Sequence, residues 1–268
     1  MSANNLRFAV DRKEFEKALH SVTLKGKYKS ANSSKISSIS NGVAGCVSDD
    51  GTTLTLGNAS DTMAAVCSVP ITELQWFSTT KQSVFFFEVE MTIKYLKTFK
   101  DDSIHIALSN SKLYLLTPQR KASVPLLVEH NGIAAITKVM SMDIPTDGTL
   151  PTFGRTTFES RIVLNGNVLA QAIKDCSNVG TATYKVNLMA FDSSFSFVIS
   201  SVNFHETESY DIHVPFLSAT GEEVTLEFSA PIDKFCVNTN MSIYLKDECP
   251  ILLCGEDRKL IIAPYIRG

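Results

Sequence analysis

The chain has 268 residues, of which 44% are hydrophobic, and its formal net charge at neutral pH is −3. This length suits one large domain or two domains of ordinary size, and the hydrophobic content is typical of a soluble globular protein with a substantial core. The charge excludes a uniformly basic nucleic-acid coat protein, but it is compatible with a local basic patch, because binding to a polyanion follows local charge.

The six cysteines show no C-x-x-C spacing, and several lie in apolar segments. We therefore expect reduced, buried thiols in an intracellular protein. The start of the chain lacks the pattern of a secretion signal, and no apolar run approaches the roughly 18 residues that a membrane-spanning helix needs. The expected location is the cytoplasm of a prokaryote or an infected host cell, or the nucleus of a eukaryote, with no membrane partner.

The first half opens with a predicted strand at residues 6–10 and an amphipathic helix at residues 11–22. Asp11 and Glu14 form a plausible capping box at the start of this helix. Its apolar positions recur at helical spacing, so Lys13 and Lys17 lie on the opposite face. A lysine-rich loop that includes Lys25 and Lys27 follows.

Strands are predicted between residues 35 and 70 and at residues 84–89, followed by a second helix near residues 90–100. On this helix Lys94 lies opposite the apolar face, and Lys97 lies on its flank. Three sequential strands then follow, at residues 103–108, 112–117 and 122–128.

Residues 129–156 are rich in Gly and Pro and show only weak periodicity, which indicates an interdomain connector. The same order of elements then begins again. A strand is predicted at 157–164, a helix near 167–179 that carries Lys174, further strands, and a short helical stretch near 229–237 that carries Lys234.

This duplication predicts an α+β protein with two tandem domains, at residues 1–128 and 157–268, joined by the connector at 129–156. The outward faces of its helices carry lysines and amides. A strand-rich protein with cationic helices on one surface is suited to an anionic partner.

Catalytic and metal-binding motifs are missing from the sequence. The five histidines lack metal-ligand spacing, and no P-loop, G-x-G-x-x-G or G-x-S-x-G motif occurs. The acid pairs at 49–50 and 101–102 are typical of turns. We expect no enzyme activity, no cofactor and no metal. A strand-rich enzyme whose site these motifs do not reveal is the remaining option of that class.

Several segments together resemble the DNA sliding clamps, most closely the proliferating-cell-nuclear-antigen type. Residues 161–164 and 169–180 resemble the start of that family's second domain, and residues 7–19 resemble the opening of its domains. Residues 247–253 and 260–266 are similar to its last two strands and its Ala-Pro-x-Ile tail. The similarity extends over nearly the whole chain.

The resemblance implies two processivity-fold domains per subunit and a homotrimeric ring, with antiparallel sheets outside and helices around the hole. Such a ring encircles double-stranded DNA without sequence specificity and tethers DNA polymerase and other clients, with a clamp loader as a further partner. The implied DNA-binding residues are Lys13, Lys17, Lys25, Lys27, Lys94, Lys97, Lys174 and Lys234. Lysines suit this role because a mobile ammonium group meets any phosphate without reading bases.

Clients of the family insert a short motif into an apolar pocket beside the connector. The implied pocket residues are Val47, Leu54, Leu150, Pro250, Ile261, Ala263, Pro264 and Ile266. Rings of this family close by pairing edge strands, for which the candidates are residues 121–128 and 209–214. A competing alignment places the first edge at residues 133–142.

Two features depart from the family pattern: the short fourth helix, which contains Pro231, and the single lysine of the third helix. A divergent clamp of this kind fits a phage, virus or archaeon. The alternative function is a clamp-like subunit of a hetero-oligomeric checkpoint or processivity factor, or a monomeric processivity factor.

Overall fold

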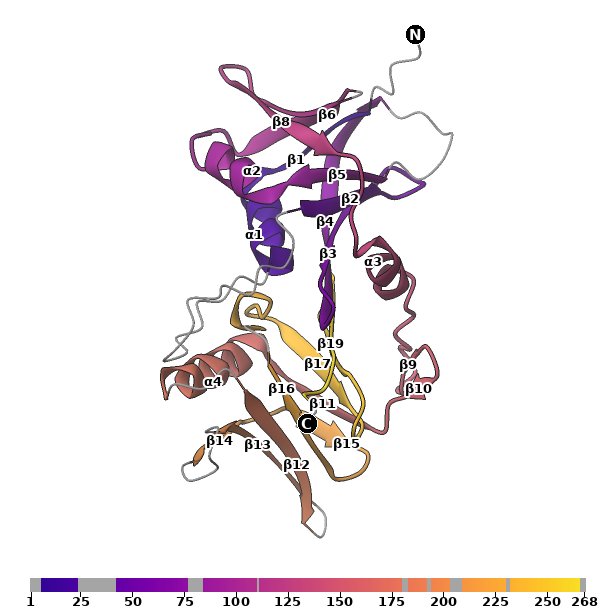
Figure 1. Cartoon of the computed structure of the whole chain (residues 1–268), viewed down its shortest axis with the longest axis vertical. Coiled ribbons are helices and arrows are strands. Elements are labelled where there is room, and N and C mark those ends of the chain that lie inside the picture. The colour runs from indigo at the N-terminus through magenta and orange to yellow at the C-terminus, as the bar shows by residue number, and fades with distance from the viewer. Residues whose placement is uncertain are drawn as a thin grey trace. The chain divides into compact units, whose positions relative to one another are not determined.

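The computed structural model describes residues 6–23, 42–76, 84–109, 111–179, 183–191, 194–202, 209–229 and 232–265. These residues divide into two compact units, with the boundary between Thr137 and Lys138. Each unit combines antiparallel strands with helices (Figure 1). No helix within the described ranges is long and apolar enough to cross a membrane.

The first unit contains the elements of the N-terminal half. They are β1 (Arg7–Asp11), α1 (Arg12–Thr23), β2 (Gly42–Val47), β3 (Thr53–Ala59), β4 (Met63–Trp76), β5 (Val84–Glu88), α2 (Val89–Leu96), β6 (Ser103–Leu108), β7 (Lys112–Leu116) and β8 (Lys121–Leu127). The strand order is β1-β6-β7-β8-β5-β2-β3-β4, and β1 also pairs with β4. The antiparallel strands of this unit therefore form a closed circuit.

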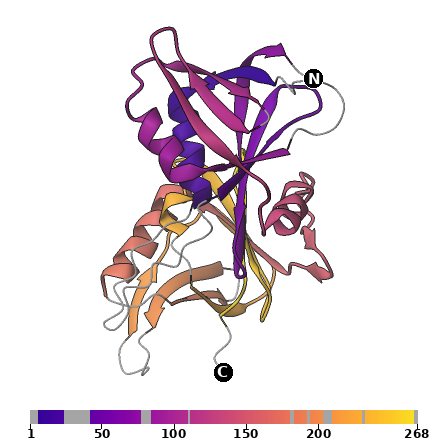
Figure 2. The same cartoon turned by 45° about the horizontal axis from the view of Figure 1, so that its top comes forward.

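Local sequence explains where the two helices of the first unit begin. The Asp11 carboxylate accepts a hydrogen bond from the backbone N–H of Glu14 at 2.9 Å, as the predicted cap requires. Glu88 caps α2 in the same way, through the N–H groups of Glu90 and Met91. The apolar stripe of α1 is buried, and α1 and α2 lie side by side in Figures 1 and 2.

The connector contains a helix that the sequence analysis did not predict, α3 (Ile133–Met140). Its Ile136 lies directly over β3, where a Cβ added at Gly57 would stand 2.4 Å from Ile136 Cγ2. Glycine is therefore needed at position 57 for this close approach. Because residues 133–140 are helical, the alternative edge strand at 133–142 is wrong.

The second unit contains the remaining elements. They are β9 (Thr152–Phe153), β10 (Thr156–Thr157), β11 (Ser160–Asn165), α4 (Gly166–Asn178), β12 (Tyr184–Phe191), β13 (Ser194–Val202), β14 (Ser209–His213), β15 (Ser218–Thr220), β16 (Val224–Phe228), η1 (Ile232–Lys234), β17 (Asn240–Leu245), β18 (Ile251–Cys254) and β19 (Arg258–Ile262). One set of strands runs β19-β18-β17-β11-β15, and another runs β14-β13-β12-β16.

The expected second helix of this unit, near 229–237, is reduced to the single 3-10 turn η1. A buried arginine fixes the end of this turn, because Arg258 donates from Nη1 to the Phe235 carbonyl at 3.1 Å. The guanidinium group also forms two hydrogen bonds with the Asp257 carboxylate. The predicted pattern of a strand followed by a full helix therefore holds for α4 but not for this segment.

All six cysteines are free thiols, and five of them are buried, as expected from the sequence. Burial raises the pKa of the Cys236 and Cys254 thiols to about 12 and that of Cys176 to about 11. These thiols are therefore protonated core residues rather than reactive nucleophiles.

Candidate functional site

The predicted cationic side chains lie on exposed positions of three helices and one turn. Lys13 and Lys17 are on α1, Lys94 is on α2 and Lys97 is its C-terminal cap residue, Lys174 is on α4, and Lys234 is in η1. Lys25 and Lys27 lie outside the described residues. The helices expose these lysines because their apolar stripes face the strands of their own unit.

The lysines of α1 each have a carboxylate close by. Lys13 Nζ lies 3.6 Å from Asp102 Oδ1, and Lys17 Nζ lies 3.5 Å from Glu14 Oε2. Arg12 also contacts an acid, since its Nη1 lies 3.4 Å from Glu16 Oε2. The exposed face of α1 is therefore closer to electrical neutrality than its lysine content indicates.

The helix of the second unit presents mainly uncharged polar groups. Asn167 and Gln171 are exposed on α4, and the Gln171 amide donates to Asp175 Oδ1 at 2.7 Å. At the start of α4, Asn165 Nδ2 donates to Asn238 Oδ1 at 3.1 Å. This surface offers amides for hydrogen bonding and much less positive charge.

The predicted client-binding residues fall into two groups. Val47 and Leu54 pair across β2 and β3 in the core of the first unit, where each has a relative exposure of 0%. Leu150, Pro250, Ala263 and Pro264 belong to the second unit and are half-buried, whereas Ile261 is buried. Ile266 lies outside the described residues. Only the second group has surface that a partner can reach within its own unit.

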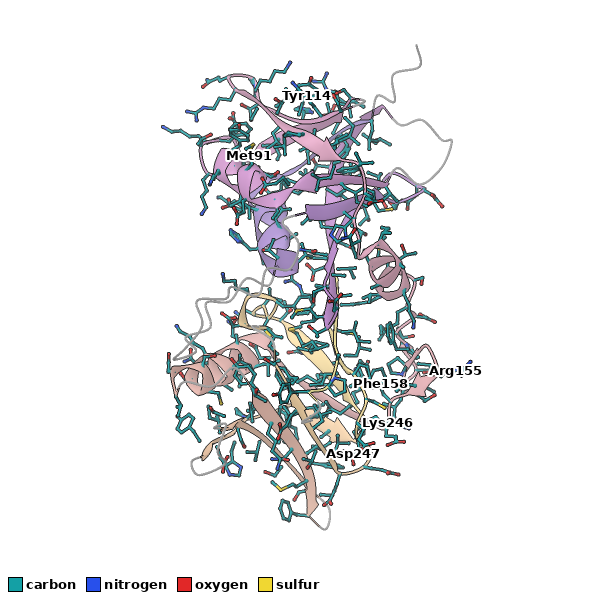
Figure 3. The ribbon with its side chains drawn as sticks, in the orientation of Figure 1. Met91, Tyr114, Arg155, Phe158, Lys246 and Asp247 are labelled. Atoms are coloured by element: carbon teal, nitrogen blue, oxygen red, sulfur yellow. The ribbon has the colours of Figure 1, made fainter. Side chains whose placement is uncertain are left out.

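The connector packs closely onto the strands of the second unit. Ile144, Leu150 and Phe153 contact a buried cluster formed by Met142, Phe158, Tyr244, Leu252 and Cys254. Phe158 points into this unit, whereas Arg155 lies at the exposed turn between β9 and β10 (Figure 3). The connector is thus an ordered part of the surface that carries Leu150.

Lys259, on β19, donates hydrogen bonds to backbone carbonyls at the end of α3. Its ammonium group donates to the carbonyl of Met140 at 3.4 Å and to the carbonyl of Met142. Met140 is the last residue of α3, so this cation satisfies carbonyls that a helix end leaves unpaired. Partial burial lowers the pKa of Lys259, and attraction to the Asp143 carboxylate opposes this shift.

The strand edges expected to join subunits differ in their accessibility. β14 pairs with β13 on one side and has no second strand partner among the described residues. β8 pairs with β7 along its length and with β5 at Leu126 and Leu127, and α2 packs beside it. The structure therefore leaves β14 open, whereas only the first part of β8 lacks a strand on one side.

The structure also contains features that the sequence analysis missed. The helix α3 had a periodic signal, because Ile133, Ile136 and Met140 recur at helical spacing. The Lys13–Asp102 pair had none, because its members are far apart in the sequence. Within the described ranges, no group of three or more His, Cys, Asp or Glu side chains is arranged to hold a metal ion.

Comparison with solved structures identifies the fold. The DNA polymerase sliding clamp of Bacillus subtilis superimposes with a TM-score of 0.69 at 15% identity, over 98% of this chain and 64% of that one. The chain has the sliding-clamp fold. The Streptococcus pneumoniae DNA polymerase III β chain aligns at 16% identity with a TM-score of 0.69, over 100% of this chain and 66% of that one. The chain therefore spans about two thirds of the length of these two bacterial clamps.

An archaeal clamp matches at full length. The PCNA of A. fulgidus, solved with the C-terminal region of FEN-1 bound, gives a TM-score of 0.68 at 12% identity and covers 98% of this chain and 99% of that one. No protein-family model and no curated protein matches the sequence. The sliding-clamp fold is therefore established here by structure, and the resemblance inferred from the sequence is confirmed at this level.

Proposed function

We propose that this protein is a DNA sliding clamp: a homotrimeric ring that encircles duplex DNA and tethers DNA polymerase and other clients. The observation that carries the proposal is the match to nearly the full length of an archaeal clamp. That clamp binds the C-terminal region of another protein, FEN-1, which supports a client-binding role for this chain as well. In this role the protein acts as a tether rather than an enzyme.

The exposed lysines support the DNA-binding part of the proposal. Lys13, Lys17, Lys94, Lys97, Lys174 and Lys234 lie on helices or a helical turn and are exposed, and Lys25 and Lys27 extend the set in sequence. Lysine ammonium groups bind phosphates as mobile point charges, which suits sliding better than the rigid bidentate contacts of arginine. The amide-rich face of α4 adds contacts that carry no charge.

The half-buried residues of the second unit support the client-binding part. Leu150, Pro250, Ala263 and Pro264 combine small or rigid apolar groups with accessible surface. Such groups suit a pocket in which the partner supplies the large anchoring side chains. We propose that clients dock on this surface of the second unit, with Ile261 and Ile266 as further contacts.

A clamp-like subunit that works alone or with non-identical partners is the second candidate. The partial pairing of β8 with β5 favours it, because it occupies Leu126 and Leu127 and leaves only residues 121–125 of this strand open to a second copy. This candidate predicts stimulation of the polymerase by a particle with a single copy of the chain, or only when a non-identical subunit is added.

Primer extension on singly primed DNA with the cognate polymerase and loader tests the proposal. The wild-type chain is expected to lengthen the products, and Lys13→Glu with Lys94→Glu is expected to reduce this effect at least about tenfold, since two phosphate contacts become repulsive. Arg7→Glu with Lys112→Glu, on β1 and β7, is the control with an equal change in charge. Products that the wild-type protein does not lengthen would contradict the tether function.

A further inference from the structure

The lysines that would meet DNA from α1 already have anionic neighbours. Lys13 reaches across to Asp102, in the turn before β6, and Lys17 pairs with Glu14 one helical turn earlier. The two acids come from different parts of the chain, so the pairing is not a consequence of helix periodicity alone. Both lysines that α1 exposes are paired in this way.

These ion pairs are too exposed to be important for folding. The side chains of Lys13 and Asp102 are 71% and 83% exposed, and those of Lys17 and Glu14 are 51% and 53% exposed. Pairs in such positions contribute little to stability, because water and salt screen them. By contrast, Arg12 and Glu16 are largely covered, and Arg12 Nε also donates to the Asp101 carbonyl at 2.9 Å, so Arg12 has a structural role.

The same two carboxylates act on any phosphate that approaches α1. A phosphate bound to Lys13 or Lys17 comes close to Asp102 or Glu14, and like charges repel at that distance. The carboxylates also lower the net positive charge that α1 presents, so fewer of the cations condensed on the DNA are released and the gain from binding is smaller.

We propose that Asp102 and Glu14 are affinity-lowering residues, which keep the contact between α1 and duplex DNA weak enough for the protein to slide. This inference rests on the proposed function, and it names the two side chains that set how tightly α1 binds DNA. Lys174 on α4 provides a contrast, because no carboxylate is within ion-pair distance of it in the described structure, and the nearby Asp175 is bonded to Gln171.

The test compares DNA binding by the full chain and two double variants of equal charge, using the anisotropy of a short fluorescent DNA duplex. Asp102→Asn with Glu14→Gln removes the two carboxylates. Asp61→Asn with Glu73→Gln removes two exposed acids from the β3–β4 turn and from β4. Thermal unfolding of each protein confirms that the fold is intact, because Glu14 lies in the first turn of α1.

At low salt the first variant is expected to bind the duplex about fivefold to tenfold more tightly than wild type, and the control about as tightly as wild type. The slope of log affinity against log salt concentration should also steepen, by up to about two, as two lysines become available to phosphates. A merely structural role for the acids would not change this slope.

Equal affinities for the first variant and the control would overturn the inference. A third protein, Lys13→Glu with Lys17→Glu, separates this result from a failure of the proposed function. If that protein binds DNA more weakly while removal of the acids changes nothing, α1 faces DNA and only the inference fails. If none of the variants differs from wild type, α1 does not face DNA and the proposed function is contradicted as well.

Discussion

Burial of apolar side chains, more than charge, determines which residues of α1 face solvent. Phe15, Leu19 and Val22 are fully buried beneath α1, and their spacing determines which residues of that helix face solvent. The exposure of Lys13 and Lys17 could therefore be predicted from the sequence. Their pairing with acids could not, because it depends on the position of the turn at Asp102, which local periodicity does not specify.

The buried thiols predict a loss of stability at alkaline pH. Cys236 and Cys254 have folded-state pKa values of about 12, above the ordinary value of 9.0, so between these values the unfolded chain releases protons that the folded chain retains. The contribution of these thiols to the free energy of unfolding is fully present below about pH 9. As the pH rises toward 12, this free energy should fall by about 1.4 kcal/mol per pH unit for each such thiol.

Urea unfolding under reducing conditions at several values between about pH 8 and pH 11 measures this slope. Cys176, Tyr184 and Tyr244, whose pKa values are also raised, add to it, whereas the lowered pKa of Lys259 opposes it. Cys236→Ala with Cys254→Ala should flatten the slope, and Cys249→Ala, which removes a half-buried thiol, is the matched control. An identical slope in both variants would show that these thiols ionise readily in the folded state.

At the scale of elements, the connector is the part that differs most from expectation. Its glycines and prolines indicated an irregular segment, but they cluster around a short run, Ile133–Met140, that is free of both and forms α3. The helix is stable because tertiary contacts support it: Ile136 packs on β3, and Lys259 binds its last carbonyl. Such contacts come from distant residues, so the weak local signal was insufficient to predict it.

A double-mutant cycle tests the contact between α3 and β3. Gly57→Ala places a Cβ 2.4 Å from Ile136 Cγ2 and should destabilise the first unit by about 1–3 kcal/mol through overpacking. Ile136→Ala removes the opposing group and should itself cost about 2–4 kcal/mol. Denaturant unfolding of the double variant should show a loss smaller than the sum of the two single losses by at least about 0.5 kcal/mol. Strict additivity would show that α3 does not rest on β3 in solution.

For the whole molecule, the repeated order of strands and helices predicted the α+β class, and the resemblance of several segments to the sliding clamps predicted the fold. The helix predicted near residues 229–237 was already short in the sequence. Its reduction to the single turn η1 accompanies the hydrogen bond from Arg258 to the Phe235 carbonyl, which the sequence did not reveal. The edges that would join copies could not be decided from sequence, because strand alternation does not reveal which strands gain a second neighbour. The structure leaves β14 open and gives β8 a partial partner in β5.

The assembly that we propose is a closed ring of three identical copies, and its mass is the most direct test. Light scattering on the purified chain at micromolar concentration is predicted to give three times the chain mass of 29.4 kDa, with no change on further dilution within that range. A particle with the mass of one chain at the same concentrations would contradict the self-assembled ring and leave a monomeric or hetero-oligomeric factor in its place.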